Sequence, residues 1–479
     1  MRTRTLSWSL AAAIAVAVTW FLLGPRAALS PSVAQGPSSV GSSPPGSSGM
    51  LGSASCSGRA CHGGFGTLEH PKDSEYTVWM LHDPHANKAY AVLFTDRSRI
   101  MERDLRGLKG VELKAVHPEN DSLCLSCHGR SAWLVKRPVG LEEGFGCESC
   151  HGPAEKWLGP HTGPAWKKKS AAEKQALGMT SLVTLSDRAR VCADCHVGAR
   201  DREVNHDLIA AGHPRLKFEF ATYQADLPRH WQQTRDPGTD FEARSWVVGQ
   251  VVSAQASLQL LAHRAQTPSK PWPEFTEYDC YACHHEFKQP SWRTQGGYPG
   301  RKPGAFPWNS WYYSMPRALA QGASPSGAPD ILKGFGTLEQ AMQKPLPNRS
   351  LVAKQAQAVE KLLGQWLPTL DSGANPRDAL QEVLPKLLKD APDGKQFRTF
   401  LNANGGTSWD ISAQFACAAT AKLASRGQLD NPEVRKTVSD LFSQLQFAPP
   451  DGGIFDSPTT FDHEKFIKQL QTIGDLLSK

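Results

Sequence analysis

The amino-acid sequence predicts a mainly α fold with few strands, in which a cysteine-rich region precedes a C-terminal helical domain of unknown role. No segment alternates apolar and polar residues strongly enough to indicate a strand. Residues 241–263 instead have apolar side chains at helical spacing, with a packing face that includes Trp246 and Leu258. After about Pro325 the chain continues as amphipathic helices. The length of 479 residues allows about three domains of typical size.

The first 34 residues have the features of an export signal. Arg2 and Arg4 precede an apolar stretch over residues 10–23, and small residues then lead to Ala34. This order predicts a signal peptide that is cleaved after Ala34, with an uncleaved N-terminal membrane anchor as the alternative. Residues 35–55 are rich in Ser, Gly and Pro and are expected to form a flexible linker. The protein is therefore expected to be periplasmic, and either free or attached to the cytoplasmic membrane.

Two domains are expected after this linker, a cysteine-rich domain over residues 56–325 and a helical domain over residues 326–479. In the second domain, Asn375-Pro376 and Asn431-Pro432 each place a capping side chain before a proline at the first helical position. Gly427 is expected to end the helix between them. That helix, over residues 409–423, contains Cys417 among alanines, where it is expected to be a buried, unreactive thiol.

Ten of the eleven cysteines form five close pairs, and a histidine follows each pair directly. The five sites are Cys56, Cys61 and His62; Cys124, Cys127 and His128; Cys147, Cys150 and His151; Cys192, Cys195 and His196; and Cys280, Cys283 and His284. The last four have the spacing C-x-x-C-H, and the first has four intervening residues. C-x-x-C-H is the signature for covalent attachment of c-type haem (heme c). Two thiols add to the two vinyl groups of the ring, and the adjacent imidazole binds the iron.

We therefore expect five covalently attached haems. The interval between His128 and His151 is too short to build a core of its own, so the haems themselves are expected to form a compact apolar stack. A zinc site would need two C-x-x-C units to converge on one ion and would not need a histidine after each pair. A thioredoxin-like motif would occur once, in a βαβ setting. Disulfides suit an exported protein but do not explain five histidines.

Eleven further histidines are available to bind the second axial position of each iron. From their local sequence, the five candidates are His161, His213, His85, His263 and His117. His285 has the same standing as His117, His206 and His82 are weaker candidates, and His70, His230 and His463 are expected at the surface. Methionine ligation by Met80 or Met179 is an unfavoured alternative. A position left open would permit chemistry on a small molecule, whereas a filled position makes an electron relay.

Two segments of the cysteine-rich region resemble the multihaem cytochrome c superfamily. They are Gly146-Cys-Glu-Ser-Cys-His-Gly-Pro-Ala154 and Asn205-His-Asp-Leu-Ile-Ala-Ala-Gly-His-Pro-Arg-Leu216. The resemblance covers residues 55–290 and is closest to the tetrahaem cytochrome that accepts electrons from hydroxylamine oxidoreductase. It implies that His161, ten positions after His151, binds the iron that is also bound by His62. The C-x-x-C-K motif of pentahaem nitrite reductase does not occur, and the region after Pro325 matches no family that we can name.

These features predict an electron carrier that passes electrons between redox protein partners, either cytochromes or an oxidoreductase. The alternative is a multihaem oxidoreductase in which one five-coordinate haem acts on a small nitrogen or sulfur species. The formal charge of +7 falls to about +4 after cleavage at Ala34, because three arginines are lost. Each bis-histidine ferric haem with two ionised propionates adds about −1, which brings five haems and the chain to about −1. No nucleic-acid partner is therefore expected.

Overall fold

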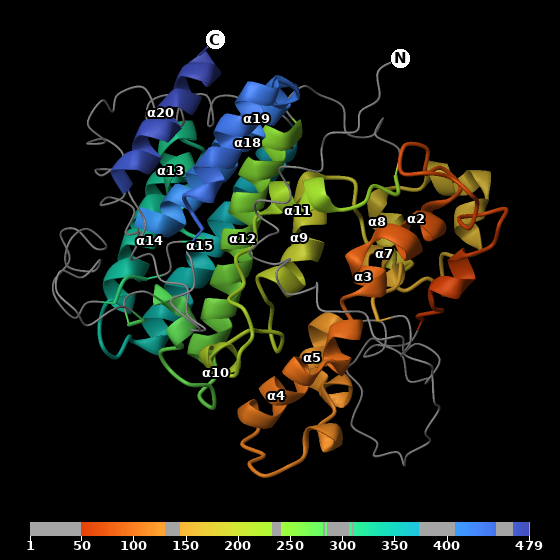
Figure 1. Ribbon diagram of the computed structural model, residues 1–479, viewed down its shortest axis with the longest axis horizontal. Helices are drawn as coiled ribbons and strands as arrows, with labels where there is room; N and C mark the ends of the chain where they lie inside the picture. Colours follow the sequence, from red (N-terminus) through yellow and green to blue (C-terminus); the bar gives the residue numbers. More distant parts are fainter. Residues whose placement is uncertain are drawn as a thin grey trace. The chain divides into compact units, whose positions relative to one another are not determined.

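The computed structural model describes residues 49–129, 144–231, 241–280, 283–284, 306–308, 311–372, 408–446 and 463–478, and these are helical with short connections (Figure 1). In these residues there is no strand, and pairing between extended segments is limited to two isolated bridges, Ala199 with Arg202 and Tyr278 with Trp308. The prediction of a mainly α fold is therefore confirmed. No helix among the described residues is long and apolar enough to cross a membrane.

The chain forms two compact units. Unit 1 comprises residues 1–102, 110–181 and 228–232, and unit 2 comprises residues 103–109, 182–227 and 233–479. Unit 2 thus contains parts of both the predicted cysteine-rich domain and the predicted C-terminal domain. The boundary near residue 325 stays a prediction.

Unit 1 is built from short helices. The α-helices are α2 (Glu75–His82), α3 (Pro84–Asn87), α4 (Asp96–Leu105, whose last residues belong to unit 2), α5 (Ser122–His128), α7 (Glu148–His151) and α8 (Ala171–Ala176). The 3₁₀ turns are η1 (Ser53–Cys56), η2 (Ala91–Phe94), η3 (Leu113–Ala115), η4 (Pro118–Asn120), η6 (Pro160–Thr162) and η7 (Pro164–Lys168). One small apolar cluster joins Ala154, Trp157 and Trp166, with Met179 packed against it. The described motif cysteines and histidines of unit 1 are partly buried or exposed, and none of them is fully buried.

Unit 2 has longer helices that pack on one another. They are α9 (Leu185–His196), α10 (His206–Ala210), α11 (Phe220–Asp226), α12 (Phe241–Gln266), α13 (Ser314–Ala323), α14 (Ala328–Met342), α15 (Arg349–Asp371), α18 (Ser408–Ser425), α19 (Pro432–Ser443) and α20 (His463–Ser478). The 3₁₀ turns η9 (Phe275–Glu277) and η12 (Gln428–Asp430) lie between them. Helix α12 packs against α15, α9, α18 and α11 (Figure 1).

Helix α12 is the centre of unit 2. All ten consecutive residues from Ser245 to Ala254 are buried, which requires neighbours on every side of the helix rather than on one face. The buried Gln250 side chain donates a hydrogen bond of 2.8 Å to Gln414 of α18, so its polar group is satisfied inside the core. The predicted packing face is confirmed, and the helix extends three residues beyond His263. Helix α12 contacts both α9, which ends at His196, and α11, which follows the segment that contains His206.

The predicted helix ends in the C-terminal region are mostly confirmed. Helix α19 begins at Pro432, and the Asn431 side chain accepts a hydrogen bond from the Glu433 amide as an N-cap. Helix α18 covers the predicted residues 409–423 and is followed by Gly427 with a φ of 67°, a left-handed conformation that favours glycine. Cys417 is buried in α18, and burial raises the pKa of its thiol well above the usual value. The predicted helix start at Asn375-Pro376 lies outside the described residues.

Candidate haem sites

The motif cysteines and histidines lie on single helical turns. In α5, α7 and α9 the final histidine of each motif is the last residue of the helix. Helical geometry places residues i, i+3 and i+4 on one side, so both thiols and the imidazole of a C-x-x-C-H motif point the same way. At the fifth site the His284 amide donates to the Cys280 carbonyl at 2.8 Å, which is the same turn. The spacing of the motif is therefore a consequence of one helical turn.

The first site differs because it has two additional residues. Its turn is closed by hydrogen bonds from the Cys61 and Gly63 amides to the Gly58 carbonyl, at 2.8 and 3.0 Å. Cys56 ends η1, where its thiol is hydrogen-bonded to that of Cys147 from the third site. This contact lowers the pKa of Cys56 to about 6. The attachment cysteines of the first and third sites are thus neighbours within unit 1.

The fourth site shows a contact of Cys195 that the motif does not predict. Cys192 and Cys195 lie half-buried in the last turns of α9. The sequence predicts a thioether bond from Cys195 to haem, and in the structure its Sγ accepts a hydrogen bond of 3.7 Å from Arg202 Nη1. The physical reason is the turn after α9, in which the bridge between Ala199 and Arg202 brings the guanidinium back to the helix end. The attachment role of Cys195 therefore stays a prediction, and Arg202 is an additional neighbour of this site.

Aromatic rings surround the motif histidine of the fourth site. The ring of His196 is stacked on that of Phe218 with centroids 5.5 Å apart, and Tyr223 approaches it edge-on at 4.8 Å. Both aromatic residues come from the segment that leads into and forms α11. This apolar surrounding suits a haem, because most of the surface of the porphyrin ring is apolar.

Disulfides and a structural zinc site each require a particular arrangement of side chains. None of the eleven cysteines, all of which are described, forms a disulfide bond. Among the described residues, no group of three or more His, Cys, Asp and Glu side chains is arranged to hold one metal ion, as a zinc site requires. A haem needs only two thiols on its edge and one or two imidazoles on its iron.

Three pairs of histidine rings are separated by nearly the same distance; two pairs are nearly parallel, at 14° and 28°, and the rings of His151 and His230 meet at 73°. The ring centroids are 6.2 Å apart for His62 and His161, 6.4 Å for His151 and His230, and 6.3 Å for His206 and His284. Imidazole nitrogens lie about 2 Å from a bound first-row metal, so two rings on opposite faces of a haem have centroids about 6 Å apart. Each pair combines one motif histidine with one histidine from elsewhere. The residues therefore fit haem with histidine on both faces at these three sites.

The Nδ1 atoms of several motif and candidate histidines are already occupied by hydrogen bonds. His128 Nδ1 is 2.8 Å from the Ala89 carbonyl, and His161 Nδ1 bonds to the Leu158 carbonyl. His62 Nδ1 is 3.0 Å from Glu75 Oε2, and this hydrogen bond raises the pKa of His62. A hydrogen bond at Nδ1 fixes the orientation of the ring, so that a metal would bind at Nε2.

Burial favours the neutral, metal-binding form of three histidines. It lowers the pKa of His151 to about 4 and also lowers the pKa values of His128 and His230. A metal-bound imidazole must be unprotonated at the coordinating nitrogen. These rings are therefore ready to bind iron at neutral pH.

Four further predicted ligands have defined polar contacts. His85 Nδ1 is 2.9 Å from Asp83, His117 Nδ1 is 2.9 Å from Glu119, and His213 Nδ1 is 2.8 Å from the Pro214 carbonyl. A metal would bind these rings at Nε2, and the contacts do not identify the iron. His263 is different, because its Nε2 lies 3.5 Å from an Asp201 carboxylate oxygen. Its assignment as an axial ligand, like those of His85, His117 and His213, stays a prediction.

For two of the three histidine pairs, the local sequence does not favour the second histidine as an iron ligand. His230 was expected at the surface, whereas it is partly buried with its ring facing His151. His206 was ranked below His213 in the same segment, yet it is His206 that faces His284. A tryptophan directly after His230 is the one local signal of an apolar environment. His70 is exposed as expected, Met80 is 44% exposed, and His285 lies outside the described residues.

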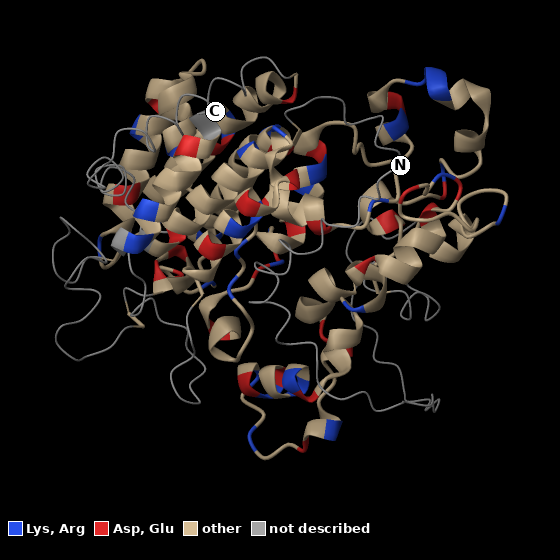
Figure 2. Ribbon diagram, turned by 45° about the horizontal axis from the view of Figure 1, so that its top comes forward, with Lys and Arg blue, Asp and Glu red and all other residues tan. Residues whose placement is uncertain are grey.

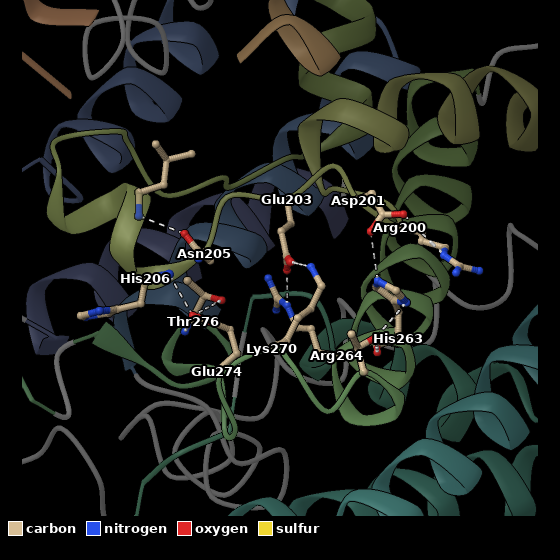
Figure 3. Close-up of polar contacts among 12 residues, drawn as sticks. Arg200, Asp201, Glu203, Asn205, His206, His263, Arg264, Lys270, Glu274 and Thr276 are labelled. Carbon is tan, nitrogen blue, oxygen red and sulfur yellow. Dashed lines mark hydrogen bonds and ion pairs between the residues drawn. The ribbon is translucent and has the colours of Figure 1, made fainter. Parts of the chain in front are cut away.

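The position of His206 depends on groups far along the chain (Figure 3). Asn205 caps α10 by accepting a hydrogen bond of 3.0 Å from the Leu208 amide, and His206 is the first helical residue. The His206 amide donates to the Glu274 carboxylate at 2.8 Å. Just before this turn, Glu203 forms ion pairs with Arg264, at 2.6 Å, and with Lys270. The segment from α9 to α10 is thus fixed at two points.

Glu148 is the acidic residue of the third motif, and its hydrogen bonds show its structural role. Its buried carboxylate accepts hydrogen bonds from the backbone amides of Leu51, Gly52 and Ala154 at 2.7 to 3.0 Å. The Ser53 hydroxyl accepts a further bond of 3.0 Å from the Cys147 amide. These bonds connect the chain just before Cys56 with the third motif. Glu148 therefore holds the first and third sites together.

We expect Glu148→Gln to loosen this connection. An amide retains one acceptor oxygen but presents N–H groups to backbone donors, and hydrogen bonds to charged groups contribute about 1.5–3 kcal/mol each. The free energy of unfolding should fall by about 3 kcal/mol. Hydrogen exchange of the Leu51 and Gly52 amides, measured by mass spectrometry, should accelerate. Glu112→Gln, which alters an exposed pair with Lys114, is the control and should leave both quantities unchanged.

The described motifs combine paired cysteines on helical turns with histidine rings at the separation that haem ligation requires, and this combination is typical of sites that attach c-type haem. Residues 55–152 match the family described as cytochrome c554 and c-prime. The match supports a cytochrome c family, with covalently bound haem, and spans the first three motifs. No curated protein and no solved structure matches the chain.

Proposed function

We propose that this protein is an exported pentahaem c-type cytochrome that relays electrons between redox protein partners. The observation that carries the proposal is the set of three facing histidine pairs, each built on one of the five cysteine motifs. When bound, each haem supplies one-electron chemistry at its iron. Two histidines on one iron leave no position for a substrate, which favours a relay over catalysis at these sites.

The spacing of sites within unit 1 supports electron transfer between haems. Cys56 and Cys147 are neighbours within unit 1, so the edges of the two attachment sites lie close together. Electron transfer falls off steeply with distance, so neighbouring edges favour direct exchange. Glu148 keeps this arrangement by joining the two segments.

Charged side chains of both signs are interspersed along the helices (Figure 2). With the predicted loss of three arginines and the charge of the haems, this mixture favours a redox protein as the partner over a nucleic acid. We further propose that the first 34 residues direct export, so that the mature protein is periplasmic or anchored to the cytoplasmic membrane.

Haem counting and electron paramagnetic resonance (EPR) test the proposal together. The purified protein should contain five haems per chain by the pyridine haemochrome assay, and mass spectrometry should assign two thioether bonds to each motif, Cys192 and Cys195 included. The oxidised protein should give low-spin EPR signals that nitrite and nitric oxide do not change. Fewer than four haems would contradict the motif assignment. A high-spin signal that shifts with either molecule would favour an oxidoreductase with one five-coordinate haem.

A further inference from the structure

Glu75 contacts the motif histidine of the first site, His62, at Nδ1, the ring nitrogen that would not bind the iron. Glu75 lies in the first turn of α2, and its Oε2 is 3.0 Å from His62 Nδ1. The other carboxylate oxygen accepts a hydrogen bond of 3.1 Å from the Asp73 amide. The Tyr76 amide also donates to the His62 carbonyl at 2.9 Å. The carboxylate and the imidazole are therefore fixed relative to each other by backbone and side-chain contacts.

The hydrogen-bond acceptor at His62 Nδ1 is a charged carboxylate, whereas the acceptors at two other histidines are neutral. His128 and His161 bond through Nδ1 to neutral backbone carbonyls. A carboxylate acceptor carries a full negative charge and makes a stronger, charge-assisted hydrogen bond. It pulls the Nδ1 proton toward itself and makes the ring a stronger electron donor to its metal.

We propose that Glu75 lowers the reduction potential of the haem attached to Cys56 and Cys61 by polarising His62. The inference rests on the proposed function and deepens it, because it assigns a tuning role to a residue outside the motif. The ferric haem iron centre carries one more positive charge than the ferrous one, so a nearby anion stabilises the ferric state. Glu75 acts through His62 and is thus a positioning and tuning residue.

The tuning has a consequence for electron flow within unit 1. The first site adjoins the third, because Cys56 and Cys147 are neighbours. A lower potential makes the first haem a stronger reductant toward this neighbour than it would be without Glu75. The carboxylate therefore favours transfer from the first site to the third.

Potentiometric titration of the full-length holoprotein tests this role. In Glu75→Gln the side chain keeps its length and an acceptor oxygen but loses its charge. We expect the midpoint potential of one haem to shift to a higher value, while the low-spin EPR signals and the haem count stay as in the wild type. Glu69→Gln is the matched control, because Glu69 is exposed and only six positions away, and it should leave all potentials unchanged.

Two results would overturn the inference. If Glu75→Gln leaves every midpoint potential unchanged, the carboxylate does not tune a haem. If it instead produces a high-spin haem, Glu75 is needed to hold His62 in place rather than to tune it. Glu75→Asp, which retains the charge, provides a second measurement and should stay closer to the wild-type potential than Glu75→Gln does. Failure of the proposed function itself would appear in the wild-type haem count and EPR spectrum.

Discussion

Replacing His230 by alanine is expected to convert one low-spin haem of this protein into a high-spin haem that binds nitric oxide. The ring of His230 faces that of His151 with centroids 6.4 Å apart, and alanine leaves that face of the iron without a protein nitrogen. EPR of the oxidised protein should show a high-spin signal that the wild type lacks. Added imidazole should restore the low-spin state, because it supplies the missing ligand.

The control for this experiment is His70→Ala, since His70 is exposed. This variant should retain the wild-type EPR spectrum and haem count. An unchanged spectrum in His230→Ala would show that His230 does not bind the third haem. A loss of the haem itself would also count against the assignment, because the thioether bonds at Cys147 and Cys150 should hold the ring without His230.

Replacing His206 by alanine should have an effect of the same size at the fifth site. Its ring lies 6.3 Å from that of His284, with Phe275 edge-on at 5.5 Å. We expect one high-spin haem in the EPR spectrum of His206→Ala. In a protein that also carries Cys280→Ser and Cys283→Ser, the fifth haem is absent and His206→Ala should add no high-spin signal.

His213→Ala is the matched comparison, because His213 lies in the same segment seven positions further on. If His213 binds another iron, its high-spin signal will persist in the protein that lacks Cys280 and Cys283. If His206→Ala behaves in that way instead, the pairing of His206 with His284 is wrong. The two variants together therefore separate the two candidate ligands of one segment.

The parts of each site that depend on one helical turn were predictable from the sequence. Cys124, Cys127 and His128 lie within five positions, so the chemistry of haem attachment fixes their spacing directly. His161 could also be predicted as a candidate ligand, because it follows the third motif in a short apolar segment. The mainly α fold and the long helix over residues 241–263 followed from apolar spacing.

Contacts that depend on the path of the chain after a motif were not predictable. Cys195 receives its hydrogen bond from Arg202 because the chain reverses directly after α9, and the C-x-x-C-H spacing carries no information about that turn. Glu75 was missed for a related reason, since a carboxylate on a helix usually faces solvent and only its contact with His62 distinguishes it.

The facing partners of His151 and His284 depend on contacts between distant segments. His230 is 79 positions from His151, and no local pattern connects them. The choice between His206 and His213 rests on the Glu274 carboxylate, which binds the His206 amide from 68 positions away. Spacing predicts the attachment cysteines, whereas the candidate second ligands can be recognised only in the folded chain.

The clamp made by Glu148 has a consequence for the order of assembly. Its carboxylate binds the Leu51 amide across 97 positions of sequence, just ahead of the first haem motif. A chain that is translocated N-terminus first exposes Cys56 and Cys61 well before Glu148 emerges. Under the export proposed above, the first site reaches its folded geometry only after the third motif has crossed the membrane, although its thiols are the earliest available. Maturation of the protein should then begin with haem on the N-terminal segment and end when Glu148 binds that segment.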